Sequence, residues 1–184
     1  MSSPDNQSAL AGESSRSTAL DSIQVGVVVE RRPADSPWQD FLYRPLAVLT
    51  GVPVATPWTV IRVDGDVTTL YAGQAVIELH RTETANYRDN LGFDAALLWV
   101  VLRPRTAEAG FDLLMVTADP AEGEALTGAG NDLVETVPMP PPIREIIKRF
   151  IAEHHIEHPF IKRRRDRSGS RQQSARPGVA EDDG

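Results

Sequence analysis

Short runs of apolar and β-branched residues recur along the middle of the chain, and polar, glycine or proline residues separate them. This pattern is typical of β-strands. Strands are predicted over residues 23–30, 44–49, 58–63, 67–71, 75–79, 97–102, 111–116 and 133–137. Asp64-Gly65 stands between two of these runs and predicts a tight hairpin turn, because this dipeptide readily adopts positive φ at both central positions. The runs 97–102 and 111–116 flank a charged loop with a glycine and are expected to be antiparallel neighbours.

A different spacing predicts helices. Apolar side chains recur at steps of three and four residues near the end of the chain, which places on one helical stripe Ile143, Ile146, Ile147, Phe150, Ile151 and His154. This helix is expected to dock on the sheet. A helix is also predicted over residues 81–90, ending near Gly92, and Asp119-Pro120 predicts the start of a short one. The expected fold is α+β, a mostly antiparallel β-sheet packed by two or three helices.

Both ends of the chain lack the large apolar residues that a core needs, so they are expected to be disordered. Residues 1–21 form an N-terminal arm rich in Ser and Ala with a net charge of −2, and residues 161–184 form a basic and then acidic tail with a net charge of +3. Residues 22–160 carry a net charge of −8 and are expected to form a single α+β domain.

Length and composition exclude a membrane span. The chain has 184 residues, of which 41% are apolar, but its longest unbroken apolar run, residues 95–102, has only eight. A membrane-spanning helix needs about 20. The N-terminus also lacks the basic start and apolar stretch of a signal peptide. We therefore expect a cytoplasmic protein that does not associate with membranes.

The catalytic inventory is small. The chain has no cysteine, which excludes thiolate catalysis, iron–sulfur ligation, persulfide transfer and disulfide exchange by this chain alone. Its lysines are Lys148 and Lys162, and neither follows a glycine-rich phosphate loop. Between residues 22 and 160 the serines are Ser22 and Ser36, and neither has the Gly-x-Ser-x-Gly setting of an exposed nucleophile. We therefore predict no catalytic residue and no cofactor.

Two histidines near the end of the long helix are weak candidates for a metal site. His154 and His158 are four residues apart, which is one helical turn, and the letters 154–158 fit the inverted zinc-protease pattern. Pro159 ends the helix directly afterwards. A further acidic ligand on a second helix would have to come from the 26 residues that follow His158, which are basic and lack the apolar residues of a core. Histidines at a helix end also interact favourably with its carbonyls and its dipole, and this structural role is the preferred interpretation.

A basic cluster follows the domain, and its candidate binding residues are Lys162, Arg163, Arg164 and Arg165. Phosphate contacts would follow from such a charge alone. The acidic domain would repel a nucleic acid, however, and no aromatic residues alternate with the arginines to stack on bases. We interpret the cluster as a solvated tail or a contact for an acidic protein surface.

The connection over residues 31–43 is the main candidate for binding. It combines aromatic residues and arginines, the residue types enriched at binding hot spots, and its candidates with the following position are Arg31, Arg32, Trp38, Gln39, Asp40, Tyr43 and Arg44. Long connections in small domains are often functional. The alternative is that Trp38 only packs over one end of the sheet.

Several segments together resemble a bacterial family known only as domain of unknown function 3305. The resemblance covers roughly residues 24–165. It is carried by the segments VGVVVERRP (25–33), PWQD (37–40), ATPW (55–58) and ELHRTET (78–84), and by the closing stretch from VPMP (137–140) through HPFIKRR (158–164). Genes of this family are often found beside genes for molybdenum-dependent formate dehydrogenases and their chaperones, which implies a role in assembling or supporting such an enzyme. Some members carry a molybdopterin-guanine dinucleotide biosynthesis label, but this chain lacks the glycine-rich start expected of a guanylyltransferase.

Two hypotheses of function remain. The first is a non-catalytic accessory protein that contacts a protein partner, an oxidoreductase subunit or its chaperone, through the 31–43 connection and the basic tail. The second is a binder or transferase for a phosphorylated ligand such as a molybdopterin nucleotide, held by Arg31, Arg32 and Arg44, because guanidinium forks suit phosphate.

Overall fold

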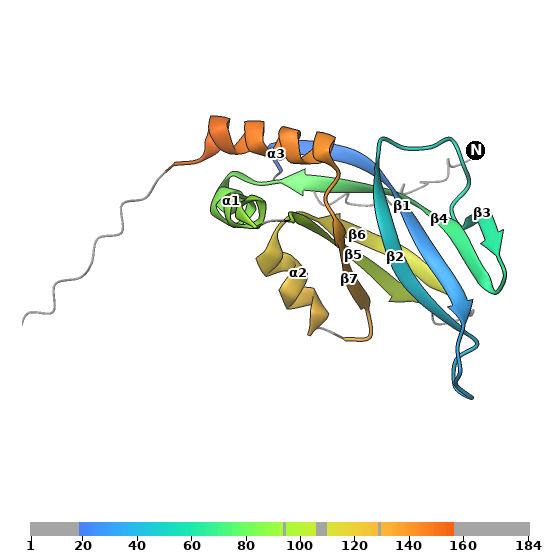
Figure 1. Cartoon of the computed structure of the whole chain (residues 1–184). Coiled ribbons are helices and arrows are strands. Elements are labelled where there is room, and N and C mark those ends of the chain that lie inside the picture. The colour runs from blue at the N-terminus through green and yellow to red at the C-terminus, as the bar shows by residue number, and fades with distance from the viewer. Residues whose placement is uncertain (1–18, 94, 106–109, 129, 157–184) are drawn as a thin grey trace, which may run out of the picture.

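Two antiparallel sheets and three helices make up the fold, as a computed structural model of the chain shows (Figure 1). The structure describes residues 19–93, 95–105, 110–128 and 130–156. The predicted α+β class is confirmed, with two sheets in place of the single sheet expected from the strand pattern. The expected N-terminal arm and basic tail lie almost wholly outside the described residues. The last residues of the arm are described, and there Leu20 donates to the Leu79 carbonyl over 2.9 Å.

The larger sheet has the order β2-β1-β4-β3. Its central strands are β1 (Asp21–Pro33) and β4 (Val67–Leu79), and its outer strands are β2 (Phe41–Thr50) and β3 (Thr59–Asp64). The inner face of β1 is apolar, because Val25, Val27 and Val29 are fully buried. The predicted hairpin between β3 and β4 is confirmed: Asp64 pairs with Val67, and Gly65 has a φ of 57°.

The smaller sheet has the order β6-β5-β7. The central strand β5 (Leu97–Pro104) pairs with β6 (Phe111–Thr117) and β7 (Leu133–Pro138), and both pairings are antiparallel. The predicted antiparallel neighbours are therefore confirmed. The sheets face each other so that β6 lies beside β4 and β7 lies beside β2. Their inner faces enclose one hydrophobic core.

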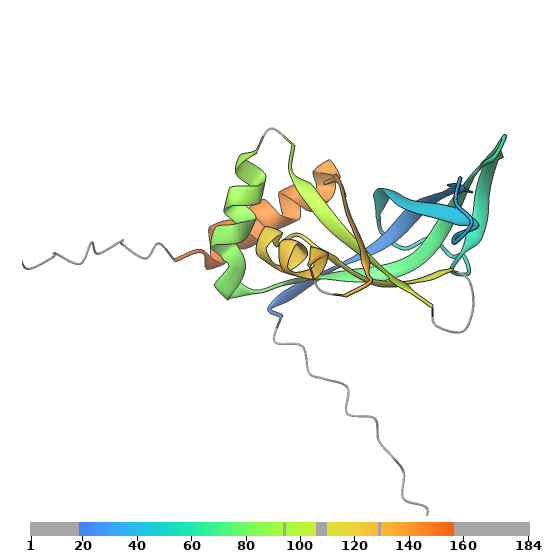
Figure 2. The same ribbon diagram turned by 90° about the horizontal axis from the view of Figure 1, so that it is seen from below.

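The helices gather at one end of the two sheets, as the second view shows (Figure 2). They are α1 (Thr84–Gly92), preceded by a short 3₁₀ turn, α2 (Pro120–Thr127) and α3 (Pro141–His154). The predicted stripe of α3 is confirmed, since Ile143, Ile147 and Phe150 are buried in the core. Asp119 begins α2 as predicted, and its side chain accepts a hydrogen bond from the backbone N–H of Ala121. Within the described residues, no helix has the length and apolarity of a membrane span.

A buried amide joins the helical end to the smaller sheet. The Asn90 side chain is 1% exposed and donates to the carbonyls of Leu97 and Ala118, each over 2.9 Å. Its oxygen accepts from the Leu97 N–H over 3.0 Å. Buried polar groups need such partners, since leaving one unpaired costs about 1–3 kcal/mol. Asn90 therefore fixes the end of α1 against the start of β5 and the end of β6.

The prediction of a long connection over residues 31–43 is wrong at both of its ends. Arg31, Arg32 and Pro33 extend β1, and residues 41–43 extend β2, so that only seven residues, 34–40, form the loop. The ladder continues through the arginines because the guanidinium carbon of Arg31 lies 4.6 Å from the centre of the Phe41 ring, a stabilising cation–π contact. Pro33 is tolerated because it is the last residue of its strand.

Gly123 in the middle of α2 allows the helix to approach the ring of Trp99 on β5. A Cβ atom at this position would overlap the indole carbons. An alanine would normally favour a helix over glycine by about 1 kcal/mol. We predict the opposite sign here: Gly123→Ala lowers the free energy of unfolding by roughly 1–3 kcal/mol, the usual cost of overpacking. Urea denaturation followed by circular dichroism measures the change.

The matched control is Gly92→Ala at the end of α1, where an added Cβ meets no atom within 4 Å. This variant is expected to be as stable as the parent chain or slightly more stable. An equal loss of stability in both variants would contradict the close contact of α2 with Trp99.

Burial also predicts how stability depends on alkaline pH. Burial raises the pKa of Tyr87 from 10.0 to about 12, and the backbone N–H of His80, which donates to its hydroxyl oxygen over 3.2 Å, opposes part of this rise. The unfolded chain therefore loses the tyrosine proton first, and the free energy of unfolding falls as the pH rises from about 10 through 12. We expect this fall to be shallower in Tyr87→Phe, by roughly 2–3 kcal/mol across the interval. Chemical denaturation at stepped pH values measures it, and parallel curves for the two chains would refute the assignment.

Candidate binding surface at the tip of the β1–β2 hairpin

The hairpin of β1 and β2 extends beyond the rest of the molecule (Figure 1). The cross-strand pairs continue to Pro33 and Phe41, and the loop is closed by a hydrogen bond from the Ala34 N–H to the Asp40 carbonyl over 2.9 Å. Inside the loop, the backbone N–H of Trp38 donates to the hydroxyl of Ser36 over 3.3 Å. A regular ladder therefore supports the loop that carries the candidate residues.

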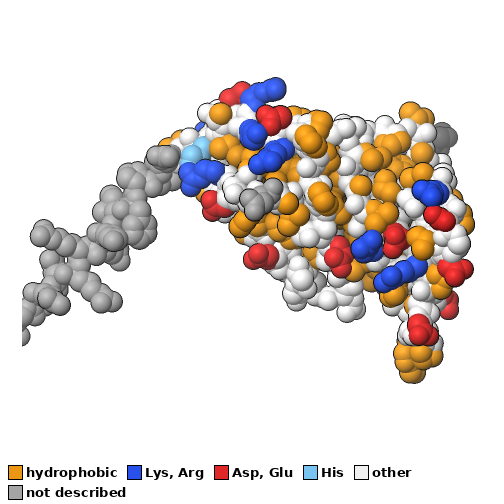
Figure 3. Space-filling view, viewed as in Figure 1, with side chains coloured by type: hydrophobic (Ala, Val, Ile, Leu, Met, Phe, Trp, Pro, Cys, Tyr) orange, Lys and Arg blue, Asp and Glu red, His pale blue; other side chains and the backbone are white. Residues whose placement is uncertain are grey.

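Trp38 lies at this tip with 92% of its surface exposed. The interpretation that Trp38 packs over one end of the sheet is therefore wrong. Phe41 and Leu42, at the base of the loop, are 37% and 40% exposed. The space-filling view shows the hairpin as a narrow protrusion with hydrophobic side chains at its end (Figure 3). Apolar surface gathered in this way is typical of interaction sites.

A hollow of about 480 Å³ lies between the tip and the smaller sheet. Four of the candidates line it together with Phe41, namely Trp38, Gln39, Asp40 and Tyr43. The opposite wall contains Pro104 and Phe111 of the smaller sheet. Sequence reasoning missed this wall, because no spacing relates residues so far apart in the chain.

Tyr43 holds the base of the hairpin in place. Its ring centre lies 5.0 Å from that of Phe111 in a tilted arrangement and 6.1 Å from that of Trp58 in an edge-to-face arrangement. Aromatic contacts of this kind contribute about 0.5–1.5 kcal/mol beyond the buried area. The hairpin is therefore anchored on both sheets before any partner arrives.

The three arginines do not converge on one anion. Glu30 pairs with Arg44 and Arg31 with Tyr43 across the ladder, so Arg31 faces the opposite side of the sheet from Arg44. The Arg44 guanidinium lies 3.8 Å from the Glu30 carboxylate, and Arg32 faces the same side as this pair. Arg31 lies on the side of Tyr43, and its buried Nε atom has no hydrogen-bond partner among the described residues. One phosphate cannot contact all three.

Some polar groups at the rim of the hollow already pair with other groups of the protein. Arg105 forms an ion pair with Asp112 over 2.8 Å, and the Gln39 amide donates to the Phe41 carbonyl. Asp40 adds a carboxylate from the loop. The hollow therefore has an aromatic floor and a rim with charges of both signs, a composition suited to a protein surface.

The two described histidines at the end of α3 make contacts within the protein. The helix α3 ends at His154, and the extended backbone of His155 follows it. The His154 ring packs on Phe150 with 4.6 Å between ring centres. His155 contacts the Thr84 hydroxyl over 3.0 Å and Arg88 over 3.1 Å, which joins the end of α3 to α1. The described residues contain no group of three or more potential ligands.

Other candidates lie outside the described residues, and they are His158, Lys162, Arg163, Arg164 and Arg165.

Comparison with known proteins identifies a family for the chain. No curated protein and no solved structure matches the chain significantly. A family model described as "Protein of unknown function (DUF3305)" matches residues 24–164, which include the hairpin, the hollow and all three helices. The chain belongs to this DUF3305 family.

Proposed function

We propose that the protein is a non-catalytic accessory protein of the cytoplasm that binds a protein partner through the tip of the β1–β2 hairpin. The exposed Trp38 carries this proposal. A tryptophan that is 92% exposed places a large apolar surface in water, which is unfavourable in free energy. Burial of this surface against a partner would be favourable.

The hairpin is suited to binding because its base is already ordered. Tyr43 packs on Phe111 and Trp58, and Arg31 lies over the Phe41 ring. A preformed surface loses less conformational entropy when it binds.

The partner we propose is an oxidoreductase subunit or its chaperone. This choice rests on the genes that accompany the family, and the absence of cysteine restricts the role further. A chain without thiols cannot hold a cluster or relay sulfur by itself, so it would support such an enzyme by contact. The basic cluster from Lys162 to Arg165 would add a second, electrostatic contact with an acidic partner.

The test is Trp38→Ala in the full chain. We expect the variant to fold and to bind its partner more weakly by about 2 kcal/mol or more, about 30-fold in Kd, as truncation of a hot-spot tryptophan does. The partner is first captured from native cells and identified by mass spectrometry, and the affinity is then measured with the purified partner.

The matched control is Phe93→Ala, another exposed aromatic residue at 65%, which follows α1 at the helical end of the molecule. It should leave the affinity unchanged. Equal affinity of the Trp38 variant and the parent chain would overturn the proposal. So would native mass spectrometry that finds a bound phosphorylated small molecule in place of a protein.

A further inference from the structure

A second surface lies along the free edge of β4, far from the hairpin tip. Two hollows of about 270 and 340 Å³ adjoin there, because Val76 and Glu78 line both. The larger reaches the start of β1 at Asp21, and the smaller lies between β4, β6 and α2. We treat these two adjoining hollows as one elongated surface and call it the edge groove.

Two strand edges that do not pair with each other border the smaller hollow. The second half of β4 pairs with β1 alone, and β6 pairs with β5 alone. In the part of the chain that the structure describes, no backbone hydrogen bond joins β4 to β6, although the two strands lie side by side. The Cα atoms of β4 and β6 approach within 8 Å, whereas a strand inserted between them would need about 9.5 Å, so a ligand of the smaller hollow is held by side chains and not by the strand edges.

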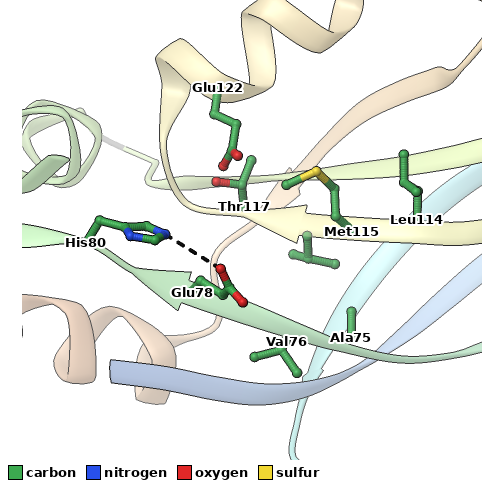
Figure 4. Close-up of a pocket in the computed structure, with 9 residues that line it drawn as sticks. Ala75, Val76, Glu78, His80, Leu114, Met115, Thr117 and Glu122 are labelled. Atoms are coloured by element: carbon green, nitrogen blue, oxygen red, sulfur yellow. Dashed lines mark ion pairs between the residues drawn. The ribbon is translucent and has the colours of Figure 1, made fainter. Parts of the chain in front are cut away.

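The side chains of the edge groove divide into an apolar wall and an acidic mouth (Figure 4). Val76, Leu114 and Met115 line the wall, and Val76 and Leu114 are 45% and 41% exposed. Glu78 of β4 and Glu122 of α2 approach from opposite sides. The close-up places the Glu122 carboxylate beside the Thr117 hydroxyl, on the side of the hollow that faces β4.

The charge of the edge groove has one sign. Asp21, Glu78 and Glu122 line it, and no lysine or arginine does. Among the described residues, the Glu78 carboxylate has one basic neighbour, the His80 ring, at 3.6 Å. The Glu122 carboxylate makes no ion pair with another described residue. An occupant must therefore be extended, partly apolar and positively charged.

We propose that the edge groove binds an extended basic segment of a partner protein. A lysine or arginine side chain fits the hollow by both of its parts: the methylene stem lies on Val76, Leu114 and Met115, and the charged end lies between Glu78 and Glu122. The site is independent of Trp38, because β1 separates the two by roughly 40 Å from Asp21 to Pro33. It therefore stands whether or not the hairpin binds the partner proposed above.

The test uses the full chain and a short fluorescein-labelled peptide in which arginine alternates with valine. Fluorescence anisotropy measures its Kd, and a second peptide with citrulline in place of arginine keeps the shape without the charge. We expect the arginine peptide to bind and the citrulline peptide to bind at least about tenfold more weakly, since citrulline has no charge to pair with the carboxylates of Glu78 and Glu122.

Substitutions locate the site. Glu122→Gln is expected to weaken binding of the arginine peptide about fivefold or more, and the double change with Glu78→Gln to weaken it further. The matched control is Glu124→Gln, an exposed carboxylate of the same helix that does not line the groove, which should change Kd by less than about twofold.

Three results would overturn the proposal. If Glu124→Gln weakened binding of the arginine peptide as much as Glu122→Gln does, the effect would come from the net charge of the protein and not from the edge groove. Loss of binding in Trp38→Ala, with the glutamate variants unaffected, would place the peptide on the hairpin. A further variant carries Lys162→Gln, Arg163→Gln, Arg164→Gln and Arg165→Gln in the full chain. If it bound the peptide about tenfold more tightly, the chain's own basic cluster would be shown to compete for the groove, so that no partner segment is needed.

Discussion

The alternation of side chains between the two faces of β1 is the constraint on which both the core and the direction of the β1–β2 hairpin depend. Where the strand faces the smaller sheet across the core, its inner face carries Val25, Val27 and Val29, all fully buried. Where the core ends, the same face continues with Arg31, whose guanidinium covers the Phe41 ring. The strand therefore leaves the core without exposing a long apolar edge, and it carries the hairpin outwards in a defined direction.

This strand also separates two surfaces of different chemistry. Its first residue, Asp21, borders the acidic edge groove, and its last residue, Pro33, adjoins the loop with the exposed Trp38. The helices lie at the end of the sheets away from the hairpin (Figure 2). Because Asn90 and Gly123 tie α1 and α2 closely to the smaller sheet, the hairpin end stays free of helices and open to contact.

The contacts at the two surfaces differ in what they can contribute. The hairpin offers apolar area on an ordered base, which favours affinity through burial. The edge groove offers carboxylates beside an apolar wall, which favour selection of a segment with long basic side chains and respond to ionic strength. A partner that met both would be held at two sites of independent chemistry.

Local patterns in the sequence were sufficient to predict most elements. Asp64-Gly65 predicted its hairpin because the turn needs only these two residues, and the stripe from Ile143 to Phe150 predicted α3 because helical periodicity is local. The exposed tryptophan, the aromatic wall of Phe111 and the separation of Arg31 from Arg44 could not be predicted in this way. They depend on the register of strands and on how two sheets pack, which are set by contacts between residues distant in the chain. The sequence by itself thus determined the elements and the absence of thiol chemistry, whereas only the tertiary structure decided which side chains meet and which remain exposed to a partner.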